Sequence, residues 1–98
     1  MYLTAYIPQI RQLCERHKVG RLHAFGSVLT EGFSEGSDVD LVVDIEDDDP
    51  LSYCDRYFDL KFTLEDLFRR PVDLLERKAI KNKYLREEIE RTGVKIYG

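Results

Sequence analysis

The most regular pattern of hydrophobic and polar positions lies between residues 38 and 45. Apolar side chains occupy the odd positions 39 to 45, and aspartates occupy positions 38, 40 and 44. Successive residues of a β-strand point to opposite faces of the sheet. The alternation therefore predicts a strand over 39–45 with one buried face, and it places Asp38 and Asp40 together at the start of the other face.

Shorter apolar stretches predict three more strands, at residues 21–25, 71–76 and 94–97. Asp73 lies between two apolar residues of the second stretch, so its side chain is expected to face away from theirs. If this strand neighbours the strand over 39–45, Asp73 will lie beside Asp38 and Asp40.

Helical spacing separates the strands. The first helix is expected to begin between Thr4 and Pro8, because proline is tolerated only in the first turn, and to end at Gly20. The last helix is predicted over 79–92, with Gly93 as its stop. Its expected inward residues are Ile80, Tyr84, Leu85 and Ile89.

A longer helix is predicted between these two, with Asp49 as N-cap, Pro50 in its first turn and an end near Phe68. Its expected inward residues are Leu51, Cys54, Tyr57, Phe58, Leu64, Leu67 and Phe68. The acidic run before it and residues 32–36 are predicted to be loops. The 98 residues are therefore expected to form one α/β (α+β) domain over 1–98, a short mixed β-sheet flanked by helices, whose strand order periodicity does not give.

Charge and cysteine usage narrow the class of protein. Fifteen basic against 19 acidic residues give a net charge of −4, so a nucleic acid is an unexpected partner. Cys14 and Cys54 lack metal-ligand spacing and are expected to be reduced packing residues. No signal peptide and no apolar run of about 20 residues is present, so we expect a cytoplasmic protein without a membrane anchor.

Candidate chemistry lies around a glycine-serine pair that follows the strand 21–25. Nine residues separate Gly26-Ser27 from Ser37-Asp38-Val39-Asp40. Glycine lets the backbone approach a phosphate, and a short helical turn after it directs N–H groups and the serine hydroxyl toward the same place. Carboxylates at i and i+2 of a strand, about 6.6 Å apart at the Cα atoms, can converge on divalent cations. All these ligands are hard oxygens, which favours magnesium.

This set resembles the minimal nucleotidyltransferase domains of the polymerase-beta-like superfamily, small prokaryotic proteins commonly encoded beside a HEPN-domain partner in toxin–antitoxin pairs. The resemblance runs through nearly the whole chain and implies a role for each matching residue. Asp38, Asp40 and Asp73 would be the catalytic, magnesium-binding acids, with Asp73 also helping to deprotonate the acceptor hydroxyl. The nucleotide-binding residues implied are Gly26, Ser27 and Ser37.

The implied reaction transfers NMP, with ATP as the expected donor, to a hydroxyl acceptor and releases pyrophosphate with the help of two Mg²⁺ ions. The acceptor is expected on a HEPN-type partner that the transfer silences, and a homo-oligomer is compatible with the sequence. Two alternatives stay open, namely an antitoxin that acts by contact alone and an enzyme that modifies a small molecule such as an aminoglycoside.

One departure from the family pattern affects the expected affinity. Many relatives carry arginines directly after the glycine-serine turn, whereas Val28, Leu29 and Thr30 follow it here. The loss of positive charge is expected to weaken nucleotide binding. The candidate replacements are Arg56, Lys61, Lys78 and Lys81.

Three other polar residues are expected to have no part in the chemistry. His17 and His23 are interpreted as packed or surface histidines, because neither has partners at metal-ligand spacing. Asp44 shares the face of Asp38 and Asp40 but lies about 13 Å beyond Asp40 at the rise of a strand, and it is expected to be a solvated strand end.

Overall fold

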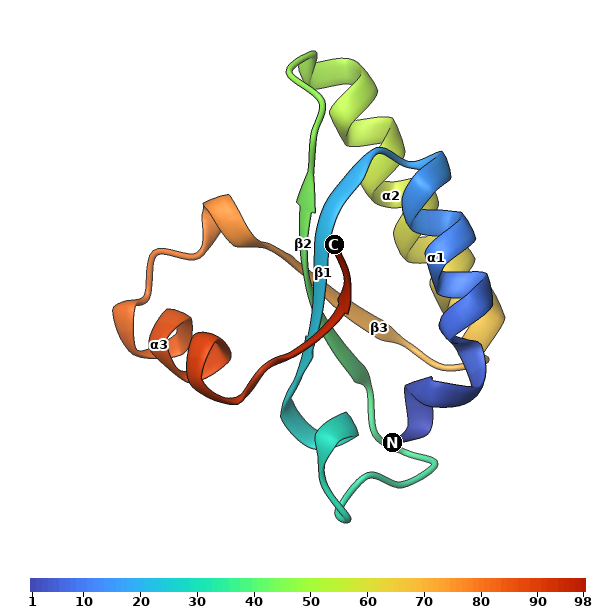
Figure 1. Ribbon diagram of the computed structural model, residues 1–98, viewed down its shortest axis with the longest axis vertical. Coiled ribbons are helices and arrows are strands. Elements are labelled where there is room, and N and C mark those ends of the chain that lie inside the picture. The colour runs from blue at the N-terminus through green and yellow to red at the C-terminus, as the bar shows by residue number, and fades with distance from the viewer.

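Four strands form one mixed sheet in the computed structural model, which describes residues 1–98 (Figure 1). The strand order is β3-β2-β1-β4. Strand β1 runs antiparallel to β2 and β4, whereas β2 and β3 are parallel. The strands are Val19–Phe25 (β1), Val39–Ile45 (β2), Val72–Glu76 (β3) and Val94–Tyr97 (β4). The mixed sheet of the sequence prediction is confirmed.

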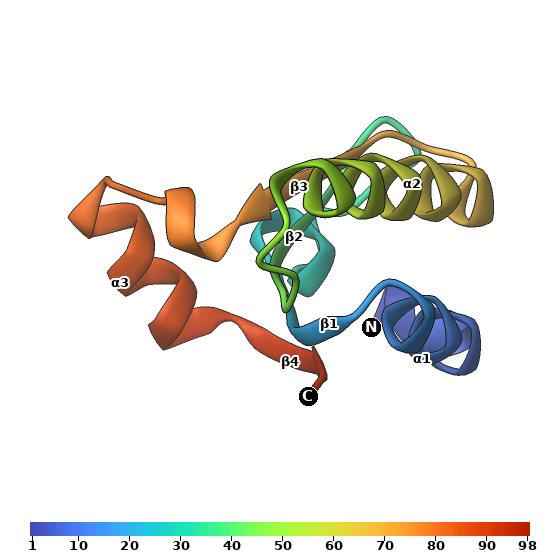
Figure 2. The same ribbon diagram turned by 90° about the horizontal axis from the view of Figure 1, so that it is seen from above.

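Helices cover the two faces of this sheet unequally. The α-helices are Ile7–Arg16 (α1), Pro50–Phe68 (α2) and Lys83–Thr92 (α3). Short 3-10 helices occupy Tyr2–Tyr6, Gly26–Leu29 and Arg77–Ala79. Helices α1 and α2 lie side by side against one face, and α3 lies on the opposite side (Figure 2). No helix combines the length and the apolar character needed to cross a membrane.

The alternation in β2 divides the buried residues between the two faces. Val39, Leu41 and Val43 belong to the main core beneath α1 and α2. Val42 points the other way and packs with residues of the α3 side in a small second core. The even positions of β2 therefore lie on the α3 side of the sheet.

Helix α2 has its predicted bounds, with the Asp49 side chain accepting a hydrogen bond from the Ser52 N–H at 2.9 Å. Part of its predicted inward face is wrong. Leu51 is 78% exposed and Phe58 45% exposed, and Cys54 is also exposed. The first turns of the helix, which contain Leu51 and Cys54, extend beyond the end of the sheet and have no core to face (Figure 1). The buried residues of α2 are Leu60, Leu64 and Phe68.

The other two helices differ from the prediction at their ends. Helix α1 stops at Arg16, before the predicted end at Gly20, which lies in β1. Lys18, and not the glycine, adopts the left-handed turn conformation (φ 57°) between the two elements. Helix α3 begins at Lys83, where the Asn82 side chain accepts hydrogen bonds from the first turn.

The predicted inward face of α3 is only half correct. Ile80, in the segment before the helix, and Ile89 are buried, whereas Tyr84 is 81% exposed and Leu85 also lies at the surface. With α3 starting after Asn82, Tyr84 and Leu85 fall in its first turn, which reaches past the small core.

Candidate active site

Strand register brings two of the predicted acids together. Asp40 and Asp73 are direct partners across the parallel pair β2 and β3, and partners on neighbouring strands point to the same face. Asp38 immediately precedes β2. Asp40 is half-buried, whereas Asp38 and Asp73 are exposed. The expectation that Asp73 lies beside the β2 acids is confirmed for Asp40.

The glycine-serine turn lies at the same end of the sheet as these acids. Strand β1 is antiparallel to β2, so Phe25 at its end pairs with Asp40, and Gly26 follows directly. Gly26 has φ +74°, and a Cβ atom built on it would lie 2.5 Å from Oδ2 of Asp40. Only glycine fits here, because any side chain would displace the carboxylate and strain the backbone.

The electrostatics of Asp40 indicate a carboxylate without enough positive charge around it. Burial raises the pKa of the Asp40 carboxyl above its usual range, and the neighbouring charges of Asp73 and Asp38 raise it further. Each effect disfavours the ionised form, and a bound cation would oppose all three.

A magnesium ion fits these residues in one particular manner. The structure holds no group of three His, Cys, Asp or Glu side chains close enough to form a complete metal cage. Mg²⁺ normally takes only one or two carboxylates from the protein and completes its shell with water and substrate phosphates. Asp40 with Asp38 or Asp73 could supply such a donor set.

The residues after Gly26 explain the missing arginines. Val28 is 3% exposed and belongs to the main core, so its position cannot present a charged side chain to a nucleotide. Thr30 is exposed, and its hydroxyl donates a 2.9 Å hydrogen bond to the carbonyl oxygen of Ser27. The turn is thus closed by its own residues.

Ser37 has a structural contact that the sequence did not indicate. Its hydroxyl accepts a hydrogen bond from the Ser34 N–H at 3.1 Å and lies 3.3 Å from the Ser34 hydroxyl. Arg70 donates from Nη1 to the carbonyl oxygens of Ser34 and Ser37, at 2.8 and 3.0 Å. Arg70 stands three residues before Asp73, and no local pattern in the sequence indicates its contacts with the Ser34–Ser37 turn.

Two of the four candidate replacement cations have other partners. Arg56 pairs with Asp47 at 2.9 Å, and the Lys78 ammonium lies 4.7 Å from the centre of the Tyr53 ring. Neither contact involves a predicted site residue. These two candidates thus have structural contacts of their own.

Asp44 is not the solvated strand end expected from the sequence. Arg21 and Arg77 form ion pairs with it at 3.0 and 3.2 Å. Arg77 also lies 3.1 Å from the ring of His23, whose pKa is lowered by burial and by the nearby positive charges. The expectation of a solvated Asp44 is wrong, because strand spacing does not indicate which cations other elements bring close to it.

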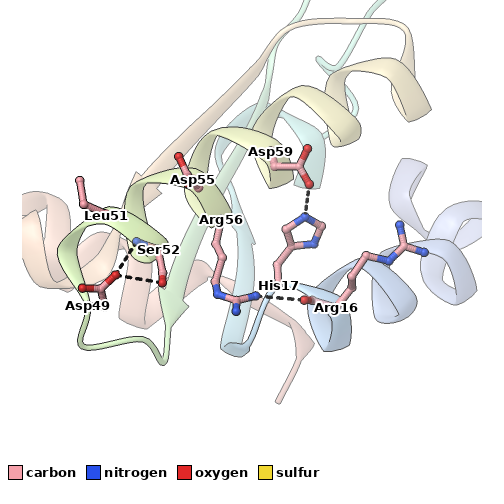
Figure 3. Close-up of a pocket in the computed structure, with 8 residues that line it drawn as sticks. All are labelled: Arg16, His17, Asp49, Leu51, Ser52, Asp55, Arg56 and Asp59. Carbon is pink, nitrogen blue, oxygen red and sulfur yellow. Dashed lines mark hydrogen bonds and ion pairs between the residues drawn. The ribbon is translucent and has the colours of Figure 1, made fainter.

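A cavity of about 800 Å³ lies at the opposite end of the sheet from the Gly26 turn (Figures 1 and 3). His17 is buried beside it as a packed histidine, with Nε2 2.6 Å from Oδ2 of Asp59 and Nδ1 2.7 Å from the Leu13 carbonyl oxygen. Arg56 donates to the Arg16 carbonyl oxygen across the same cavity. None of the predicted catalytic acids lines it, so its size does not mark the active site. Its lining residues are Arg16, His17, Asp49, Leu51, Ser52, Asp55, Arg56 and Asp59.

Comparison with known proteins identifies the family of the chain. The profile of the nucleotidyltransferase domain family matches residues 8–96. A protein of Methanocaldococcus jannaschii with a provisional name as a protein adenylyltransferase is 38% identical over 79 residues, which are 80% of this chain and 76% of that protein.

Two solved structures share the fold. One, described as a minimal nucleotidyltransferase, has a TM-score of 0.78 and 32% identity, covering 95% of this chain and 91% of its own. The other is a chain from the complex of an MNT antitoxin with the tri-AMPylated Shewanella oneidensis HEPN toxin. It has a TM-score of 0.67 and 21% identity, covering 96% of this chain and 71% of its own. Together with the family profile, these matches show that the chain belongs to the nucleotidyltransferase domain family and is a minimal nucleotidyltransferase.

Proposed function

We propose that this nucleotidyltransferase uses magnesium and ATP to transfer AMP to a hydroxyl group of a HEPN-domain partner protein. The observation that carries the proposal is the pairing of Asp40 with Asp73 directly beside Gly26. Two acids on adjacent strands, next to a turn that begins with a glycine, form an open, oxygen-rich site for a phosphate-bound cation.

Each residue has a distinct part in the proposed reaction. Asp38 and Asp40 would hold the magnesium ions, and bound magnesium would neutralise the phosphate charge. Gly26 lets the backbone approach the triphosphate, and Ser27 offers a hydroxyl to it. Asp73, which is exposed and close to Asp40, takes part in removing the proton of the acceptor hydroxyl.

The proposed reaction is a single displacement at the α-phosphorus of ATP. The acceptor oxygen forms a bond to the α-phosphorus of ATP, and the bond from that phosphorus to the bridging oxygen of the β-phosphate breaks. Pyrophosphate leaves with the bond electrons, and the acceptor proton passes to Asp73 and then to solvent. The cytoplasm, where ATP is available, is the expected site of this reaction.

The similar proteins favour a protein as the acceptor. The M. jannaschii relative is named for protein adenylyltransfer, and the solved complex contains a HEPN toxin that carries AMP. We extend both features to this chain, with the HEPN-type protein as the acceptor and loss of its toxicity as the consequence.

Binding of nucleotide to the acids tests this function. We expect isothermal titration of Mg·ATP to show saturable binding to the wild type and none to the Asp38→Asn/Asp40→Asn variant, although that variant stays folded. Undiminished binding by the double variant would place the nucleotide elsewhere and overturn the proposal.

A second candidate function is neutralisation of the partner by contact alone. The specific observation in its favour is the turn after Gly26, where buried Val28 and neutral Thr30 occupy positions that carry arginines in many relatives. Under this alternative, variants of the three acids would still protect cells from the partner.

A further inference from the structure

Arg70 connects three segments that are distant in the sequence. Its guanidinium group lies 4.7 Å from the centre of the Tyr2 ring and 4.5 Å from that of Phe33, a geometry typical of cation–π contacts. The same group donates two hydrogen bonds, to the carbonyl oxygens of Ser34 and Ser37. The N-terminal segment, the loop before β2 and the segment before β3 therefore meet at one side chain.

The backbone on both sides of Asp38 is held by this meeting point. The carbonyl oxygen of Ser37, which accepts from Arg70, belongs to the planar peptide unit that leads into Asp38. On the other side, the N–H of Val39 donates to the Pro71 carbonyl oxygen at 3.1 Å. Asp38 is thus flanked by two hydrogen bonds to consecutive residues, Arg70 and Pro71.

The surrounding loop has little else to fix it. Ser34, Glu35 and Gly36 are exposed, and their internal hydrogen bonds are those of a short turn. Two residues after Pro71 the chain reaches Asp73. The segment that holds Asp38 is therefore the segment that delivers Asp73, so a shift at Arg70 would change the separation of the two acids.

We propose that Arg70 is a positioning residue for the metal and nucleotide site, fixing Asp38 relative to Asp73 through the Ser34–Ser37 turn. The assignment rests on the proposed magnesium-dependent function of these acids. A planar guanidinium can stack on two rings and donate to two carbonyl groups at once, which a lysine ammonium cannot reproduce.

The test compares the Mg·ATP affinities of Arg70 variants with those of the wild type and of a matched control variant. Groups that orient metal ligands typically contribute about ten- to a hundredfold to affinity. We therefore expect Arg70→Ala to weaken Mg·ATP binding by about tenfold or more, and Arg70→Lys to fall between it and the wild type. Arg69→Asn is the matched control. It removes the neighbouring charge at a position with φ 58°, which asparagine accepts, and its affinity should stay unchanged.

A second background separates positioning from general damage. In an Asp38→Asn protein the Arg70 change should have little further effect on the residual affinity, because the residue through which it acts is already altered. Wild-type affinity of both Arg70 variants, or an equal loss in both backgrounds, would overturn the assignment. If Arg70→Ala fails to fold, Arg70→Lys decides the question. A wild type that does not bind Mg·ATP would overturn the proposed function and this inference together.

Discussion

Gly26 and Asp40 touch in a way that leaves no room for a side chain on the first of them. A Cβ atom on Gly26 would lie 2.5 Å from Oδ2 of Asp40, and the backbone at Gly26 has φ +74°. The close approach of the turn to half-buried Asp40 therefore requires glycine at position 26. This contact joins the turn proposed to bind phosphate to a carboxylate of the candidate site.

Replacing Gly26 by alanine should damage both stability and the site. The positive φ and the contact with Asp40 together should lower the free energy of unfolding by about 1–3 kcal/mol, which urea unfolding would measure. Gly36→Ala is the control, since a Cβ atom there meets nothing within 4 Å. Equal behaviour of the two variants would show that the Gly26 contact is unimportant.

Asp40→Asn should stabilise the metal-free protein. Burial and two neighbouring acids raise the pKa of Asp40 above its unfolded value, so the folded state binds a proton more readily. Wild-type stability must then fall as pH rises from the ordinary aspartate pKa through the raised one, and it stays low at neutral pH. In EDTA, thermal unfolding at pH 7 should show a higher midpoint for Asp40→Asn, and this advantage should vanish in acid.

Asp44→Asn provides a control of opposite sign on the same face of β2. Its carboxylate pairs with Arg21 and Arg77, so its removal should lower the midpoint at pH 7. A rise for both variants would indicate a general effect of net charge and not the crowding of Asp40 with Asp73 and Asp38.

An introduced arginine should be destabilising at one position after the turn and tolerated at another. Val28→Arg buries a charge in the main core and should destabilise the protein by about 3 kcal/mol or more. Thr30→Arg places the charge at an exposed position and should leave the unfolding midpoint within a few degrees of the wild type. Thermal unfolding distinguishes the two, and a stable Val28→Arg protein would contradict the packing described above.

The large cavity between α1 and α2 should be irrelevant to nucleotide binding. Arg56→Gln removes a cation from its lining, and we expect Mg·ATP affinity to change by less than about twofold, with a stability loss below about 1 kcal/mol. Calorimetry on this variant checks the point. A large loss of affinity would move the site to that end of the molecule.

Strict periodicity and caps made most of the fold predictable. The alternation in β2 and the Asp49 N-cap with Pro50 specify local structure directly, and both are where the sequence indicated. The buried faces of the helices were harder to predict from the sequence. The exposure of Leu51 and Tyr84 depends on where the sheet ends and not on helical spacing.

The candidate site was predictable only in part for a similar reason. Asp40 and Asp73 were identified from strand position, and the β2–β3 register confirmed that they are neighbours. The proposed role of Arg70 depends on its contacts with Ser37 and Ser34. These residues lie 33 and 36 positions earlier in the chain, so no local sequence pattern indicates the contacts.

Transfer of AMP to the partner tests the central claim most directly. The purified HEPN-type partner would be incubated with Mg²⁺ and ATP labelled at the α-phosphate, with wild-type protein or with Asp73→Asn. We predict labelled partner with the wild type, and a loss of at least about a hundredfold with Asp73→Asn, which should keep much of its Mg·ATP binding. Equal labelling by the two proteins, or neutralisation of the partner without any label, would contradict the account.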